Sequence, residues 1–172
     1  SAYTSGMVSA NSTITIRFTM PAQKFTKAGD ELDDNVFKIS PSIDGKTYWV
    51  DDQTIEFKPT NPLVSGEIYT IRFFLGKVLE VHDSRFEKFD FSIRVIPQSI
   101  DVDFDGLIIN GKDDSITYNL EGTVRVADYT SIEKLTKCFW ANYNRQNLKL
   151  ELQENDLKSY RIKFFGIKST TR

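Results

Sequence analysis

The sequence is poor in the residues from which most catalytic and metal sites are built. It has one cysteine, Cys138, and one histidine, His82. A single cysteine cannot form an internal disulfide, and one histidine without strong neighbouring ligands cannot hold zinc. The 9 glycines are scattered, and none belongs to a G-x-x-x-x-G-K phosphate loop. We therefore expect no cofactor-binding and no metal-binding residues.

Long apolar runs and an excess of one charge are also missing. No stretch approaches the roughly 20 apolar residues of a membrane-spanning helix, and no signal peptide is recognisable. The formal net charge is −2, with 11 basic and 13 acidic residues up to Ile96 and 11 of each after it. Neither part is a basic block, so we expect no nucleic-acid partner and no direct membrane insertion.

The sequence does contain many aromatic residues and a hydrophobic pattern of period two. Phe occurs 13 times and Tyr 7 times, which favours strands. Apolar residues alternate with polar ones, a pattern that places one strand face on a core and the other in water. The clearest alternating sets before Ile96 are Ile14, Ile16, Phe18 and Met20; Phe37 and Ile39; Tyr48 and Val50; Ile55 and Phe57; Tyr69, Ile71 and Phe73; Phe89, Phe91, Ile93 and Val95.

Turn signals separate these runs at the spacing of a β-sandwich. Asp44-Gly45 suits a tight hairpin with positive φ, and Asp51-Asp52 predicts a second turn. Gly66 precedes Tyr69 by three residues at a strand start, which predicts a tyrosine corner rather than an ordinary half-buried tyrosine. Residues 1–96 are therefore predicted to form one β-sandwich.

A second domain is predicted over residues 97–172, because Pro97 interrupts the ladder and alternation then restarts. A change of register at Glu121-Gly122 predicts a bulge. Thr130 and Glu133 have the spacing of a capping box, so a helix is expected near 131–141 on an apolar stripe. The alternating residues are Ile100, Val102 and Phe104; Ile116, Tyr118 and Leu120; Val124 and Val126; Leu148, Leu150 and Leu152; Tyr160, Ile162 and Phe164. The predicted fold class is all-β, with two tandem sandwiches, the second carrying one short helix.

The segment Asp101–Gly106 matches the opening of a calcium loop, D-x-D-x-D-G. Such a loop places a bidentate Glu at its twelfth position, where this chain has Lys112. Val102 and Phe104 are also expected to face a core. A strand with three carboxylates on its solvent face accounts for the whole segment, and we favour it over the calcium loop.

Three further candidates for chemistry are weaker than their structural alternatives. Ser84, His82 and Asp83 could be written as a triad, but neighbours on an extended chain point in opposite directions and cannot form the relay. Cys138 lies beside the apolar stripe of the expected helix and is predicted to be a buried, inert thiol. Trp49 could form an exposed sugar- or domain-binding platform, although ordinary packing is favoured; Phe139-Trp140 is a second aromatic pair. No catalytic residue is assigned.

Several strings resemble a known arrangement of domains. Phe37–Pro41, Gly45–Trp49, Thr54–Pro59 and Leu63–Tyr69 are similar to a bacterial Ig-like domain at the start of bacterial alpha-2-macroglobulin-like proteins. Passages that resemble the macroglobulin-like domain that follows are Ile96–Gln98, Phe104–Leu107, Leu120–Val124 and the helix from Ser131.

The resemblance implies a non-catalytic piece of a large envelope-anchored or periplasmic protein that traps proteases, lipid-anchored at full length. Its implied partners are neighbouring domains of the same polypeptide and, through the full-length protein, host or competitor proteases. The C-x-E-Q thioester motif of many members is absent, since Cys138 is followed by Phe139, Trp140 and Ala141. The alternative is an adhesive or carbohydrate-binding Ig-like module of another bacterial surface protein.

Overall fold

The computed structural model describes residues 2–32, 35–81, 83–111 and 116–168. Within them the chain is mostly strand, which confirms the all-β class. It divides into two compact units, Ser1–Pro97 and Gln98–Arg172. No helix in the described part is long and apolar enough to cross a membrane. His82 and Lys112 lie outside the described residues.

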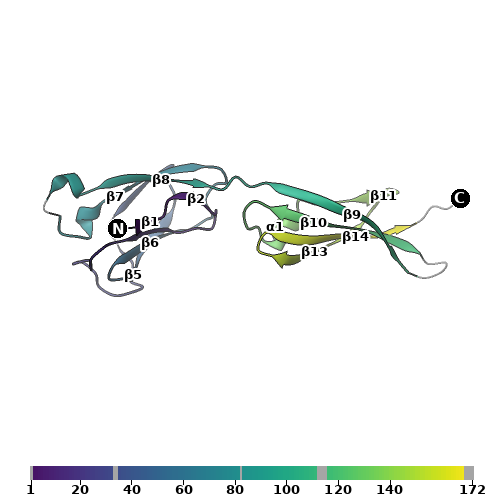
Figure 1. Ribbon diagram of the computed structural model, residues 1–172, viewed down its shortest axis with the longest axis horizontal. Helices are drawn as coiled ribbons and strands as arrows, with labels where there is room; N and C mark the ends of the chain where they lie inside the picture. Colours follow the sequence, from purple (N-terminus) through teal and green to yellow (C-terminus); the bar gives the residue numbers. More distant parts are fainter. Residues whose placement is uncertain (1, 33–34, 82, 112–115, 169–172) are drawn as a thin grey trace. The chain divides into compact units, whose positions relative to one another are not determined.

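The first unit consists of two four-stranded sheets that enclose one hydrophobic core. One sheet contains β1 (Ala2–Tyr3), β3 (Ile14–Arg17), β6 (Thr54–Pro59) and β5 (Gly45–Asp51), in that order. The other contains β2 (Gly6–Val8), β8 (Phe89–Val95), β7 (Ile68–Phe73) and β4 (Phe37–Ser40). Two short 3₁₀ helices, η1 (Leu75–Lys77) and η2 (Ser84–Phe86), lie between β7 and β8. The strands of the two sheets can be followed as separate layers in Figure 1.

Alternating burial confirms most of the period-two pattern in this unit. Ile14, Ile16 and Phe18 are buried, as are Phe57 and Phe91. Met20 is an exception, because β3 ends at Arg17 and the Met20 side chain lies 56% exposed beyond it. The predicted core face of Tyr48 and Val50 is also wrong: in β5 it is Trp49 that is buried, while Val50 is 46% exposed.

The tyrosine corner is present. The Val64 N–H donates a hydrogen bond to Oη of buried Tyr69 over 3.1 Å. Gly66, between them, has a φ of +77°, the left-handed region that glycine adopts without strain. The corner therefore fixes the loop that leads into β7.

The prediction of a hairpin at Asp44-Gly45 is wrong. β4 pairs with β7, whereas β5 pairs with β6, so the segment between β4 and β5 crosses from one sheet to the other. Gly45 is not among the residues of positive φ. Its constraint is space: a Cβ there would lie 2.4 Å from the Phe57 ring. The second predicted turn is confirmed, since Asp51 Oδ1 accepts from the Gln53 N–H at the β5–β6 hairpin.

The second unit is built on one antiparallel sheet of four strands. The sheet order is β13 (Lys149–Asp156), β14 (Ser159–Lys168), β10 (Thr117–Val126) and β9 (Ile100–Asn110). A separate two-stranded hairpin, formed by β11 (Asn142–Tyr143) and β12 (Gln146–Asn147), precedes β13 in the sequence. The covering layer of this sheet is the segment from Ile132 to Ala141, which packs on the core, rather than a second large sheet.

The single helix α1 covers only Ile132–Thr136, so the predicted extent of 131–141 is wrong. Ser131, not Thr130, occupies the N-cap position, and no side-chain cap bond forms. Leu135 is fully buried against the sheet. Cys138 follows the end of the helix and is exposed, so the predicted burial of its thiol is also wrong.

The predicted bulge is confirmed between β9 and β10. Glu121 pairs with Gly106 and Gly122 pairs with Phe104, which leaves Asp105 as the extra residue of β9. A Cβ on Gly122 would lie 2.5 Å from the Asp103 carbonyl oxygen. Glycine at this position therefore permits the close approach of β9 to β10.

Candidate functional site

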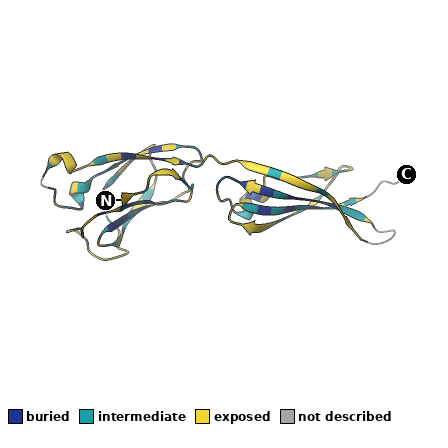
Figure 2. Ribbon diagram, viewed as in Figure 1, coloured by how far each residue is buried: buried dark blue, intermediate teal, exposed yellow. Residues whose placement is uncertain are grey.

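The strongest candidate site is the surface of β9, the edge strand of the second unit. β9 has β10 on one side, and no backbone hydrogen bond to its other side occurs among the described residues. It is coloured almost entirely as exposed or half-buried in Figure 2. An unpaired strand edge presents free N–H and C=O groups to a partner strand.

The core-side face of β9 is apolar and only partly covered. Paired residues of an antiparallel ladder point to the same face, and Phe104 and Leu107 pair with Gly122 and Leu120 of the core face. Even so, Phe104 is 48% and Leu107 58% exposed. Ile100, Ile109 and Ile116 are exposed as well. We call Ile100, Phe104, Leu107 and Ile109 the β9 apolar face.

Coverage fails at β9 because the covering segment lies over the other edge of the sheet. α1 contacts β13, and Leu135, Phe139 and Ala141 join the core formed by β10, β13 and β14. The prediction that Phe104 is buried in a core is therefore wrong. The side chain does lie on the predicted side of the sheet, but it is 48% exposed there. Sequence alternation reveals which face is apolar, but it does not reveal whether anything covers that face.

The opposite face of β9 is acidic as far as the bulge, and beyond the bulge it carries Ile108, which is 42% exposed. Asp101 and Asp103 pair in register with Arg125 and Thr123, and no ion pair of either carboxylate occurs among the described residues. Asp105 differs, because its carboxylate lies 2.7 Å from the Arg161 guanidinium. The predicted strand is thus confirmed for Asp101–Gly106. A calcium loop wraps its ligands around the ion, whereas this segment is extended.

A charged cluster on the same polar face joins β9, β10 and β14. Glu121 lies 2.7 Å from Lys163 and 3.1 Å from Arg161, which also reaches Asp105. The hydrogen bonds from Lys163 and then Arg161 hold the pKa of Glu121 below its ordinary value. Because both cations are paired, they are not free to neutralise Asp101 or Asp103.

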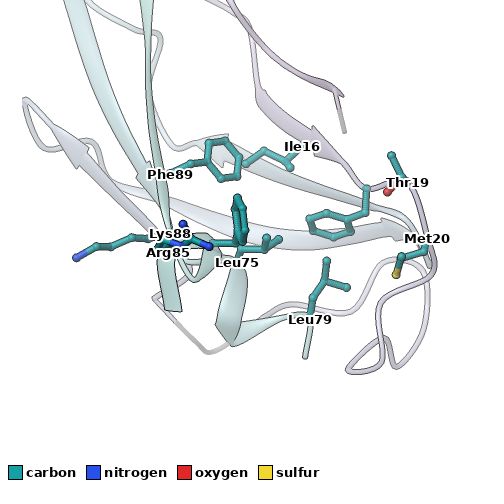
Figure 3. A pocket seen from close by; sticks show the side chains of 10 residues that line it. Ile16, Thr19, Met20, Leu75, Leu79, Arg85, Lys88 and Phe89 are labelled. Carbon is teal, nitrogen blue, oxygen red and sulfur yellow. The ribbon is translucent and has the colours of Figure 1, made fainter. Parts of the chain in front are cut away.

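An apolar pocket of about 310 Å³ lies in the first unit and is shown in Figure 3. Ile16, Leu75, Leu79 and Phe89 form much of its lining, and Met20 lies at one end. Arg85 and Lys88 also border the pocket, but Arg85 already forms an ion pair with Asp83 at 2.7 Å. The pocket has the size to hold a small apolar group. No local sequence pattern predicts this pocket, because its lining residues come from β3, η1, η2 and β8 and the segments next to them.

The structure places the other residues that the sequence analysis singled out in different environments. Trp49 is buried at 3% exposure and packs edge-on against Phe25, with ring centroids 5.5 Å apart, so it is not a platform. Trp140, in contrast, is 83% exposed. Asp83 caps η2 through the Arg85 N–H, and Ser84 is its first residue. In the described part of the chain no three His, Cys, Asp or Glu side chains are grouped as metal ligands.

No model of a known protein family matches the chain. No curated protein matches it either.

Proposed function

We propose that this chain is a non-catalytic structural part of a larger bacterial cell-envelope protein of the macroglobulin-like, protease-trapping kind. Its role is to carry and space neighbouring domains. In the full-length protein it lies in the periplasm or at the surface, attached by a lipid anchor. The strings that resemble the Ig-like and macroglobulin-like domains support this proposal, together with the all-β architecture of both units.

The observation that carries the proposal is the β9 apolar face. Contiguous exposed apolar side chains on a soluble domain mark a surface that another polypeptide covers. Leu107 and Ile109 are 58% and 65% exposed although they lie on the core side of the sheet. A spacer domain whose face is completed by a neighbouring protein segment would expose such a face when it stands alone.

A protease-protection assay tests the proposal on the full-length natural protein. A protease enclosed in a large trap remains open to small substrates, while protein substrates are kept out by their size. We expect the full-length protein to block cleavage of a protein substrate by trypsin while a chromogenic peptide is still cleaved. Equal protection of both substrates, or of neither, would contradict the trap.

The 172-residue chain alone provides the matched control. It should protect neither substrate, because a scaffold piece cannot enclose a protease. Direct inhibition of trypsin by the isolated chain would show an inhibitor of another kind.

One observation favours the alternative of a carbohydrate-binding module. Trp140 is 83% exposed, and an exposed indole ring can stack on a sugar. Glycan-array binding that is lost in Trp140→Ala and retained in Tyr129→Ala, a second exposed aromatic of this unit, would support the alternative. Absence of binding by the unmodified chain would remove it.

A further inference from the structure

The ladder between β9 and β10 determines what a partner of β9 must look like. In an antiparallel pair, alternate residues of a strand direct their N–H and C=O groups toward the neighbour, and the others direct them away. No backbone hydrogen bond to the groups of β9 that point away from β10 occurs among the described residues, so these groups can bind one more strand. A strand that pairs there places its side chains alternately beside the two faces of β9.

On one face the partner meets apolar side chains. Ile100 and Phe104 are 42% and 48% exposed, and Leu107 and Ile109 continue the same face beyond the bulge at Asp105. Each apolar side chain that a partner adds here extends the core of Val124, Ile162 and the residues around them. Every second residue of the partner is therefore apolar.

On the other face the partner meets Asp101 and Asp103, which are exposed and have no ion-pair partner within the described residues. Among the described cations of the sheet, Arg125 pairs in register with Asp101, whereas Arg161 and Lys163 hold Asp105 and Glu121. Opposite charges at cross-strand positions stabilise a pair of strands, and like charges destabilise it. The residues of the partner that lie beside Asp101 and Asp103 are therefore basic.

The same charges disfavour a second copy of this chain as the partner. If two β9 strands paired antiparallel around Val102 or Asp103, the carboxylates of residues 101, 103 and 105 would face one another. Edge strands of natural proteins use charge in this way to avoid pairing with themselves. Self-protection alone, however, does not account for the apolar side chains on the opposite face.

We propose that β9 binds an extended segment of a partner polypeptide in which apolar and basic side chains alternate, and that this segment joins the sheet as a fifth strand. This proposal rests on the proposed function, since it gives the chemistry of the segment that completes the scaffold. Addition of a strand to an open edge is an established mode of peptide recognition. Here the backbone edge provides the pairing, and Asp101 and Asp103 select the charge of the partner.

The test uses two labelled synthetic peptides of equal length, one alternating valine and lysine and the other alternating valine and glutamate. Fluorescence anisotropy with the 172-residue chain should show the lysine peptide binding at least about tenfold more tightly than the glutamate peptide. Added salt should narrow that difference. Equal binding of the two peptides, or binding of neither, would overturn the proposal.

Charge-reversed variants separate this surface from general attraction to an acidic protein. The double variant Asp101→Lys/Asp103→Lys should reverse the preference toward the glutamate peptide. The matched control Asp44→Lys/Asp52→Lys makes the same change in net charge at exposed sites of the first unit and should leave the preference unchanged. If both double variants behave alike, the binding is not located at β9.

Two further measurements test strand addition itself. N-methylation of alternate residues blocks one backbone edge of the peptide, so methylation of one alternate set should abolish binding and methylation of the other should leave it. Leu107→Ser should weaken binding several-fold without unfolding the unit, because this side chain is 58% exposed. If binding responds neither to N-methylation nor to Leu107→Ser, the proposal is overturned in favour of simple charge attraction. If sedimentation shows a concentration-dependent dimer that Asp101→Lys/Asp103→Lys alters, it is overturned in favour of self-pairing of β9.

The outcomes separate this inference from the proposed function. If the peptides do not bind but the full-length protein protects the protein substrate, the fifth-strand proposal is wrong and the scaffold proposal stands. If the lysine peptide binds selectively but the full-length protein gives no protection, the chain is a strand-binding module and the protease-trap proposal is wrong.

Discussion

Asp105 of β9 and Arg161 of β14 form an ion pair of 2.7 Å although β10 lies between their strands. The bulge makes this contact possible, because Asp105 is the extra residue that has no partner on β10. The same guanidinium reaches Glu121 at 3.1 Å. The pair therefore ties the open edge of the sheet to its interior, while Asp101 and Asp103 remain available.

We expect Asp105→Asn to lower the free energy of unfolding by less than about 1 kcal/mol, since exposed ion pairs contribute little. The Arg161 and Asp105 side chains are 37% and 47% exposed. Urea denaturation followed by circular dichroism measures the change. A much larger loss would show that the ion pair holds β9 in register. The control is Asp103→Asn, because Asp103 has no ion pair with any residue that the structure describes.

The tyrosine corner predicts a larger effect from a smaller change. Tyr69→Phe removes the acceptor of the Val64 N–H, and a donor left without a partner costs about 1–3 kcal/mol. Tyr48→Phe in the same unit is the control, because Tyr48 lies half-buried on the outer face of β5. Equal midpoints for the two variants in urea would mean that the corner does not stabilise the loop before β7.

The aromatic core of the first unit gives the largest expected losses. Phe57→Ala and Phe91→Ala should each cost about 3–5 kcal/mol, because they remove buried rings from a close-packed interior. Phe86→Ala, at a ring that is 61% exposed, should cost far less. Chemical denaturation that follows the unfolding of the first unit provides the comparison. Shifts of equal size in all three variants would contradict the placement of these rings.

How far the sequence predicts this fold depends on which interactions are local. The alternation that predicts Tyr160, Ile162 and Phe164 as one core face is a property of the strand itself, and all three are buried. The tyrosine corner was also recognisable, because its donor and acceptor are five residues apart. The Asp44-Gly45 hairpin failed because nothing local distinguishes a turn within one sheet from a crossing between two.

The candidate site was the least predictable part. Alternation predicts the strand β9 and its acidic residues, but it also predicts a buried Phe104, because alternation shows which side of a strand is apolar and not what covers that side. Exposure of that face depends on where α1 packs, and α1 is only five residues long. Cys138 and Trp140 lie beyond the end of α1 and are exposed. The helix expected over 131–141 therefore led to the wrong prediction that Cys138 is buried.

The close approach at the bulge gives a prediction for glycine. Gly122→Ala places a Cβ 2.5 Å from the Asp103 carbonyl oxygen, which forces β9 away from β10. Overpacking of this kind costs about 1–3 kcal/mol. Gly76→Ala is the control, since the nearest atom to its Cβ would lie at 3.5 Å. If Gly122→Ala and Gly76→Ala change the denaturation midpoint of the chain by the same amount, β9 adapts to the added methyl group without strain.

Tyr160 should make the second unit sensitive to alkaline pH. Burial, followed by the nearby Glu154 carboxylate, raises the pKa of its phenol above the ordinary 10.0, and the hydroxyl donates to the Thr130 carbonyl over 2.6 Å. The folded unit therefore keeps this proton at a pH at which the unfolded chain loses it. Its contribution to stability is complete below about pH 10 and is lost as the pH rises through the higher pKa of the folded state.

Denaturant midpoints measured as a function of pH test this sign. Tyr160→Phe should cost about 1 kcal/mol at neutral pH, through the lost hydrogen bond, and should show a shallower alkaline decline than the unmodified chain. Tyr129→Phe, at an exposed ring of the same unit, should retain the full decline. If Tyr160→Phe and the unmodified chain lose stability in parallel above pH 10, the alkaline transition arises from other groups, and the buried phenol does not control it.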